Sequence, residues 1–275
     1  MTPSEARAMA EEGIVEGATS DIGYSRFSSG EWTATATAVP SEMALSVYVN
    51  KQELATLLCT PAKLNYLILG FLYSEGVIDR MDDIASMRVC EDDSLAEVTL
   101  VRSDYSPPVR RTLASGCGGG VTLDKQLDPV ESGVTVTPGQ VSALMRQLNE
   151  QAKLYRYCGG VHTAGLGDGG HLVVVAEDIG RHNTVDKIMG ECLMAGQPTK
   201  DRALVATGRI SSEMLSKAAR MQVPIVISRS SPTDRAIALA RELGITLIGY
   251  ARGDRLSVYS HAERLEGHSN KAALN

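Results

Sequence analysis

The stretch "PIVISRSSP", residues 224–232, decides the fold, because a short apolar run of β-branched residues that breaks into a polar turn is typical of a buried strand in an α/β protein. Three other stretches repeat this pattern: "LVVVAEDIG" at 172–180, "ALVATGRIS" at 203–211 and "TLIGYARGD" at 246–254. Segments with helical periodicity lie between successive runs. The order β-α-β-α-β-α-β predicts an α/β fold in which a substantially parallel sheet carries helices on its faces.

The part of the chain before these runs reads as a smaller α+β portion. Residues 1–28 are rich in Ser, Gly, Ala and Glu without steady periodicity, so we expect a flexible N-terminal arm or a loosely docked edge. Residues 29–115 alternate like strands around one helical pattern, from Leu64 to Leu72, with Gly76 placed to end the helix. The strands expected here are 33–39, 44–50, 53–60, 84–90 and 95–102, with a tight turn joining the second to the third.

A glycine-rich loop and linker, residues 116–137, leads to the α/β domain at 138–275. That domain opens with a helix expected over 138–154, whose apolar residues recur at helical spacing. The whole chain of 275 residues is long enough to bury a full core.

Composition and cysteine content limit the classes of protein to which this chain can belong. The five cysteines are an odd number, and no apolar signal-peptide core follows the opening residues, so we expect a cytoplasmic protein with reduced thiols. The apolar run at 64–78 is interrupted by polar residues and is shorter than the roughly 20 residues of a membrane helix, so we expect no membrane segment. A net charge of −6 and a pI near 5.5 argue against a nucleic-acid partner, and any anionic ligand must be met by a local basic cluster.

Polar residues follow each of the four apolar runs, where parallel strands bring their carboxyl ends to one edge of a sheet. Taken singly, each arginine in these turns is better explained as a cap on the sheet or as the partner of a neighbouring acid. The series favours a ligand that carries phosphate or pyrophosphate, which guanidinium groups bind bidentately. Neither G-x-G-x-x-G nor G-x-x-x-x-G-K-[ST] is present, so the usual nucleotide loops are missing. The polar residues of the turns include Glu177, Asp178, Arg181, His182, Thr207, Arg209, Ser211, Arg229, Ser230, Tyr250, Arg252 and Arg255.

His162 and His182 invite a metal interpretation, with Cys158 four residues before His162. Zinc sites draw on cysteine or histidine pairs at short spacing, however, and the chain has no C-x-x-C. The paired motifs of zinc deaminases are missing as well, because His162 is followed by "TAG". We therefore expect no bound metal and no hydrolytic deamination, and we interpret each histidine as a satisfied polar residue or one that orients a substrate.

One cysteine has an unusual setting. Cys117 lies in "LASGCGGGVTLD", residues 113–124, where the glycines remove bulk and loosen the backbone. This suits an accessible thiol that carries sulfur as a persulfide, and Arg110 and Arg111 lie just upstream. A flexible structural loop explains the same composition. The cysteines interpreted as small core residues are Cys59, Cys90 and Cys192.

Six motifs in series carry a resemblance to a known family. They are "CTPAKLNYLILGFLYSEGVI", "SGCGGG", "GGVHTAGL", "EDIGRHNTVDKIMG", "GRISSEMLSKAAR" and "LIGYARGDRLSVYSHAERL". In this order, over about residues 40–266, they resemble the formate dehydrogenase accessory sulfurtransferases, the FdhD/NarQ family. The resemblance implies a three-layer α/β/α fold similar to that of cytidine deaminases without the zinc, and a homodimer.

The resemblance also implies an activity. Members of the family accept sulfur from a cysteine desulfurase as a cysteine persulfide and pass it to the molybdenum cofactor, bis(molybdopterin guanine dinucleotide), before that cofactor enters formate dehydrogenase. By matching position, Cys117 corresponds to the persulfide-bearing cysteine and residues 250–255 to the stretch that contacts the cofactor. His162, Asp178 and His182 are assigned to positioning the metal end of the cofactor or to moving protons. The expected cofactor-binding residues are Tyr250, Ala251, Arg252, Gly253, Asp254, Arg255, Arg181, His182, Arg209, Arg229, His162 and Asp178.

The chain departs from the family pattern at one place. The family loop commonly reads "C-G-x-C-G", whereas the second cysteine position here is Gly120. One thiol suffices to carry a persulfide, because the acceptor attacks the outer sulfur directly. The departure keeps a second hypothesis open, a chaperone that binds and delivers the cofactor without sulfur chemistry. A third, a nucleotide-binding hydrolase or deaminase of the same fold, finds no metal ligand set in the sequence.

Overall fold

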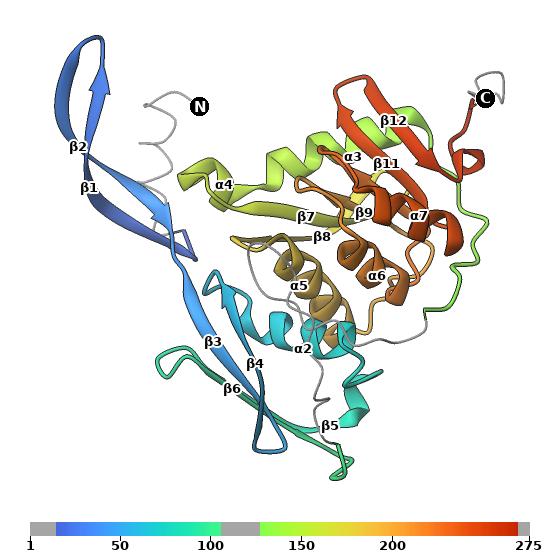
Figure 1. Cartoon of the computed structure of the whole chain (residues 1–275), viewed down its shortest axis with the longest axis horizontal. Coiled ribbons are helices and arrows are strands. Elements are labelled where there is room, and N and C mark those ends of the chain that lie inside the picture. The colour runs from blue at the N-terminus through green and yellow to red at the C-terminus, as the bar shows by residue number, and fades with distance from the viewer. Residues whose placement is uncertain (1–14, 106–126, 269–275) are drawn as a thin grey trace.

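In the computed structural model, which describes residues 15–105 and 127–268, the strands form three sheets (Figure 1). A two-stranded ribbon, β1 (Ala18–Ser28) and β2 (Glu31–Pro40), extends away from the body. A four-stranded sheet has the order β4-β3-β6-β5, and a six-stranded sheet has the order β12-β11-β10-β9-β7-β8. The chain therefore builds the ribbon and the small sheet before the large one.

The large sheet contains the four predicted strands and two that the sequence patterns missed. β9, β10 and β11 run parallel, but β7 runs antiparallel to β8 and β9, and β12 runs antiparallel to β11. The expectation of a substantially parallel sheet is therefore wrong outside its centre, because β7 separates β8 from β9. The strands are β7 (His162–Asp168), β8 (His171–Asp178), β9 (Ala203–Ala206), β10 (Ile225–Ser228), β11 (Thr246–Arg252) and β12 (Arg255–Ser260).

Strand β7 escapes a pattern search because its sequence, "HTAGLGD", has glycines where strands usually have β-branched residues. These glycines make room for helix α3 (Pro138–Gln151). A Cβ atom on Gly167 would lie 2.6 Å from Leu144 Cδ2, and one on Gly165 would lie 3.2 Å from Leu148 Cδ1. Because β7 is antiparallel to both neighbours, β8 still points the same way as β9, β10 and β11. The carboxyl ends of the four predicted strands therefore lie at one edge of the sheet.

Helices cover both faces of the large sheet. The apolar face of α3 packs on one side, against Val205, Ile227 and Ile248. The other side is covered by α5 (Arg181–Met194), α6 (Ser212–Arg220) and α7 (Asp234–Glu242). This arrangement gives the expected α/β/α layers, while the likeness to cytidine deaminases stays a prediction. The helix expected over 138–154 ends at Gln151, and α4 (Lys153–Cys158) follows after Ala152.

The small sheet and helix α2 (Leu64–Ser74) form a second hydrophobic cluster beside α5. The predicted hairpin of β3 (Met43–Val49) and β4 (Gln52–Cys59) is confirmed, as are β5 (Ile84–Cys90) and β6 (Leu95–Leu100). Gly76 follows the helix at a φ of +67°, a left-handed conformation that suits glycine. In the described ranges no helix is long and apolar enough to cross a membrane.

Within the expected N-terminal arm, Ala18–Ser28 forms strand β1 paired with β2, a strand that the sequence patterns missed. The sequence lacks a clear alternation here because most of the ribbon is exposed on both faces, so no hydrophobic period marks a buried side.

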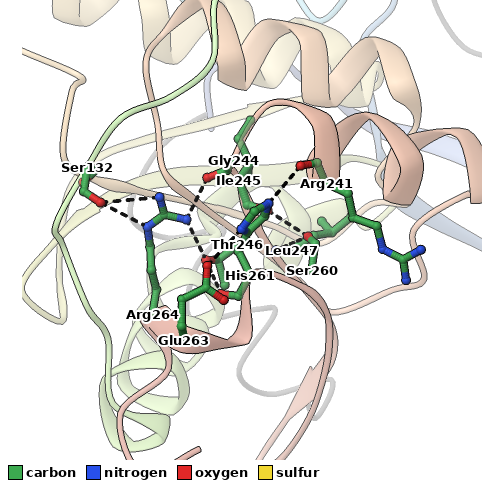
Figure 2. Close-up of polar contacts among 10 residues, drawn as sticks. All are labelled: Ser132, Arg241, Gly244, Ile245, Thr246, Leu247, Ser260, His261, Glu263 and Arg264. Carbon is green, nitrogen blue, oxygen red and sulfur yellow. Dashed lines mark hydrogen bonds and ion pairs between the residues drawn. The ribbon is translucent and has the colours of Figure 1, made fainter. Parts of the chain in front are cut away.

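A polar network at the amino end of β11 fastens the segment that enters α3 (Figure 2). Arg264 Nη1 donates to the carbonyl oxygen of Gly244 at 2.7 Å, and its Nη2 lies 3.4 Å from the carbonyl oxygen of Ser132. His261 accepts at its own carbonyl from the hydroxyl of Thr246 at 2.8 Å. The short helix η2 (Ala262–Arg264) thus holds residues near 132 at the edge of the sheet opposite the carboxyl ends.

Candidate functional site: a cleft at the carboxyl edge of the sheet

A cleft of about 990 Å³ opens where the ends of β9, β10 and β11 face helices α3 and α4. Its size suits a small-molecule ligand. The polar side chains on its sheet side come from four strand ends: the carboxyl ends of β9, β10 and β11, as the carboxyl-edge rule predicts, and the amino end of the antiparallel strand β7. They include His162, Thr163, Thr207, Arg229, Ser230 and Arg252.

Hydrogen bonds hold these strand ends together. The hydroxyl of Thr207 accepts from the backbone N–H of Thr163 at 3.0 Å and lies 3.2 Å from its carbonyl oxygen. One strand further on, the buried hydroxyl of Ser228 donates to the carbonyl oxygen of Gly208 at 2.7 Å and accepts from the N–H of Ser230 at 2.9 Å. The floor of the cleft is therefore preorganised by side chains that its turns themselves supply.

Two arginines line the cleft together. Arg252 Nε donates to the carbonyl oxygen of Arg229 at 3.1 Å, so the ends of β10 and β11 are tied to each other. Within the described residues neither arginine forms an ion pair with a carboxylate. Among the described residues these arginines thus have no acidic partner, while the bond from Arg252 to the Arg229 carbonyl agrees with the alternative of a cap on the sheet. Guanidinium groups that line a cleft can also bind an anion.

His162 lies at the back of the cleft, next to Gly208 and Arg181, which do not line the cleft themselves. A Cβ atom on Gly208 would lie 3.1 Å from His162 Nδ1 and 3.2 Å from Arg181 Cβ, so a side chain at this position would require one of these neighbours to shift. Burial, aided by the positive charges of Arg181 and Arg209, lowers the pKa of His162, although Asp178 acts in the opposite direction. A neutral imidazole here offers one donor and one acceptor to a ligand.

Asp178 lies away from the cleft, buried at the end of β8 and next to the start of α5. Its carboxylate is 2.6 Å from Lys187 Nζ and also accepts from the N–H groups of Thr60 and Gly180 and from the amide of Asn183. Both charges are fully buried. This carboxylate joins α5 to the small-sheet layer through Thr60 and has no free lone pair directed at a ligand.

His182 is also buried behind the strand ends, not on the cleft. Its Nε2 lies 3.4 Å from Ser211 Oγ and 3.4 Å from Glu213 Oε2, at the amino end of α6. Burial, together with the charges of Arg181, Lys217 and His162, lowers the pKa of His182 to about 3. The ring is therefore neutral and ties α5 to α6.

The stretch 250–255 forms the hairpin between β11 and β12. Ala251, Arg252, Gly253 and Asp254 line the cleft, and the hydroxyl of Ser142 on α3 donates to the carbonyl oxygen of Gly253 at 2.8 Å. The tip of the hairpin is thereby fixed to the helix. A second hollow lies along the hairpin and is lined by Tyr250, Arg252–Asp254, Arg255, Leu256 and Ser257.

The sequence patterns missed the far wall of the cleft. Met145, Arg146 and Asn149 project from α3, and Tyr155 from α4. Their signal is present in the sequence, because they lie beside the buried stripe of Val141, Leu144 and Leu148, but nothing indicates which face of the helix looks onto the strand ends. Cys117 and Gly120 lie outside the described residues, and among the described ones no group of three or more His, Cys, Asp or Glu could hold a metal ion.

These features define an α/β protein with a basic cleft at the carboxyl edge of a mixed sheet. The model of the FdhD/NarQ family matches residues 40–266, and the chain belongs to this family.

Similar proteins cover most of the chain. It is 40% identical to the "Sulfur carrier protein FdhD" of Bacillus licheniformis over 252 residues, which are 88% of this chain and 95% of that protein. It is 38% identical to the protein of the same name from Bacillus subtilis over 87% of this chain and 95% of that protein. A crystal structure assigned as a formate dehydrogenase accessory protein from Desulfotalea psychrophila superimposes with a TM-score of 0.77 at 26% identity, covering 90% of this chain and 99% of that one.

Proposed function

We propose that this protein is a sulfurtransferase that supports formate dehydrogenase by carrying sulfur on Cys117 to the molybdenum cofactor. The observation that carries the proposal is the cleft with Arg229 and Arg252, found in a chain whose relatives are named sulfur carrier proteins. A carrier needs a nucleophilic thiol and a place to bind the acceptor. The family pattern supplies the first at Cys117, and the cleft supplies the second.

The loading step is a thiol exchange. The thiolate of Cys117 attacks the outer sulfur of a persulfide on a cysteine desulfurase, forms a new S–S bond and releases the donor thiolate. Delivery of that outer sulfur as sulfide consumes two electrons, which a thiol reductant supplies, and returns Cys117 to the thiolate. No step requires a second cysteine, so Gly120 in the family's second cysteine position is compatible with this chemistry.

The proposed acceptor is bis(molybdopterin guanine dinucleotide), which is a substrate of this reaction and not a resident group of the protein. Its pyrophosphates match guanidinium donors, and Arg229 and Arg252 would bind them with the hydroxyl of Ser230 as a further donor. His162 would offer its neutral ring to the part of the ligand that reaches the back of the cleft. Asp178 and His182 contribute indirectly, by fixing α5, and not by contact.

The remaining partners follow from the same proposal. The donor is a cysteine desulfurase, the recipient of the sulfurated cofactor is formate dehydrogenase, and the working form is a cytoplasmic homodimer. Because the protein has a net charge of −6, the anionic cofactor would be bound by the local arginines of the cleft and not by the overall charge.

The test follows labelled sulfur. The purified protein is incubated with a cysteine desulfurase and ³⁵S- or ³⁴S-cysteine, and the native chain is compared with Cys117→Ala by intact and peptide mass spectrometry. A persulfide on the Cys117 peptide, absent from the variant, is the expected result. Cys158→Ala is the matched control, because burial raises the pKa of that thiol to about 11 and leaves it a poor nucleophile.

The chaperone hypothesis gives the opposite result. A chain that only delivers the cofactor would retain no label on Cys117, would still bind guanine nucleotides, and as Cys117→Ala would activate formate dehydrogenase as well as the native chain does.

A further inference from the structure

Among the residues that the structure describes, one edge of the ribbon of β1 and β2 carries features that block strand pairing and the other carries few. In β1 the pairing register shifts between Thr19 and Ile22, with Asp21 at a φ of +60°, and Arg26 adds a charge. Strand β2 is different, since residues 32–40 contain no charged side chain and the register from Glu31 to Thr37 runs without a shift. Proteins commonly block exposed edges with bulges, charges and prolines, and β2 has such residues only at its two ends, Glu31 and Pro40.

The outer part of the ribbon is also exposed on its faces. Trp32 is 71% exposed and Phe27 is 58% exposed, and their rings form a cross-strand pair with centroids 5.1 Å apart. The described contacts with the body lie at the base, where Ser20 Oγ is 3.0 Å from the hydroxyl of Tyr157. An isolated two-stranded hairpin is at best marginally stable in water, so this ribbon calls for further strands.

We propose that β2 pairs with β2 of a second copy of this chain, antiparallel across a two-fold axis, so that two ribbons form one four-stranded sheet. This inference rests on the proposed function, which includes a homodimer, and it assigns the interface of that homodimer. It does not depend on the sulfur chemistry. In this two-fold (isologous) contact each copy offers the same edge to the other, so the assembly stops at two copies.

The side chains of β2 complement themselves in such a pairing. With Thr35 at the axis, Trp32 lies opposite the partner's Ala38, and Ala34 opposite the partner's Ala36. These alanines share one face of the strand with Trp32 and leave room for the indole ring. On the other face Thr33 lies opposite the partner's Thr37, a favourable cross-strand pair. Glu31 lies opposite the partner's Val39, so no like charges meet.

The experiment measures molar mass by light scattering after size exclusion over a range of protein concentrations, and follows the emission of Trp32, the only tryptophan in the chain. Ala34→Lys places two like charges near each other across the proposed interface. Ser25→Lys is the matched control, because Ser25 is the cross-strand neighbour of Ala34 and carries the same charge on the same face, one strand further from the axis.

We expect the native chain to be a dimer whose Trp32 emission shifts to the red on dilution. Ala34→Lys should raise the dissociation constant of the dimer by about tenfold or more, and Ser25→Lys should leave it nearly unchanged. A native chain that is monomeric at every concentration overturns both the homodimer and this interface. A dimer that tolerates Ala34→Lys, or that both lysine variants weaken equally, overturns the interface alone. Loading of Cys117 with labelled sulfur, measured on the same samples, reports separately on the proposed function.

Discussion

Gly70 of α2 and Gly190 of α5 each lie against the backbone of the other helix. A Cβ atom on Gly70 would lie 1.8 Å from the carbonyl oxygen of Asp186, and one on Gly190 would lie 1.9 Å from the carbonyl oxygen of Tyr66. The contact is reciprocal, because each helix offers a glycine and, four residues away, the carbonyl that meets the other glycine. It joins the small-sheet layer to α5, the helix whose first turn lies behind the cleft.

Replacing either glycine should separate these layers. Gly70→Ala and Gly190→Ala each force a methyl group onto a backbone oxygen that cannot move aside alone, so we expect each to lower the free energy of unfolding by about 3 kcal/mol. Urea unfolding followed by circular dichroism measures this. Gly133→Ala is the control, because nothing lies within 4 Å of its added Cβ atom. Equal stability of Gly70→Ala and Gly133→Ala would show that the helices are further apart than described.

The arginine pair of the cleft predicts a binding defect without a folding defect. Arg252→Ala and Arg229→Ala should each weaken binding of molybdopterin guanine dinucleotide or of GDP by about tenfold or more. Each variant would lose a charge-assisted hydrogen bond to phosphate. Isothermal titration calorimetry at two salt concentrations measures the affinity and its ionic dependence. Arg88→Ala, on the exposed small sheet, is the control. If the affinity fell equally in all three variants, the cause would be the lost positive charge on the protein as a whole and not a contact in this cleft.

The sequence was most informative where an element is buried on one face or on both. The β-branched runs predicted β8 to β11, because they show local periodicity. The carboxyl-edge rule predicted that the arginines of all four turns meet. Of these, Arg229 and Arg252 line the cleft together, whereas Arg181 and Arg209 are not among its lining residues. Strand β7 could not be predicted, since its glycines serve the approach of α3, a contact made with a segment distant in sequence. Asp178 illustrates the same limit, because its position after a strand resembles that of a ligand residue whereas its partner, Lys187, lies two turns along α5.

The buried pair of Asp178 and Lys187 should act in stability and not in ligand binding. Asp178→Asn and Lys187→Met each leave one buried group without its partner, so we expect each to lower the free energy of unfolding by about 3 kcal/mol or more. The double variant should lose less than the sum of the two, as a double-mutant cycle of urea unfolding would measure. Folded Asp178→Asn should bind GDP as the native chain does.

A partly exposed ion pair provides the comparison. Lys63 Nζ lies 2.6 Å from Glu191 Oε2, and Glu191→Gln should cost less than about 1 kcal/mol, since solvent screens this pair. If Asp178→Asn kept full stability but lost GDP binding, Asp178 would belong to the ligand site after all.

His182 predicts how stability changes with acid. Its pKa is lowered from the ordinary 6.5 to about 3 in the folded protein, so between these values the unfolded chain binds a proton that the folded chain does not. Stability should therefore fall as the pH drops below about 6.5, with a contribution from this residue of at most about 1.4 kcal/mol per pH unit. The raised pKa of Glu213 acts in the opposite direction, because the folded chain then binds a proton more readily than the unfolded one.

The variant His182→Gln removes the contribution of His182 and leaves that of Glu213. Its free energy of unfolding, measured at pH 7.5, 6.0 and 5.0, should therefore decline less steeply than that of the native chain. His171→Gln, at an exposed position, should follow the native curve, and parallel curves for native and His182→Gln proteins would mean that the folded chain protonates His182 as readily as the unfolded chain does.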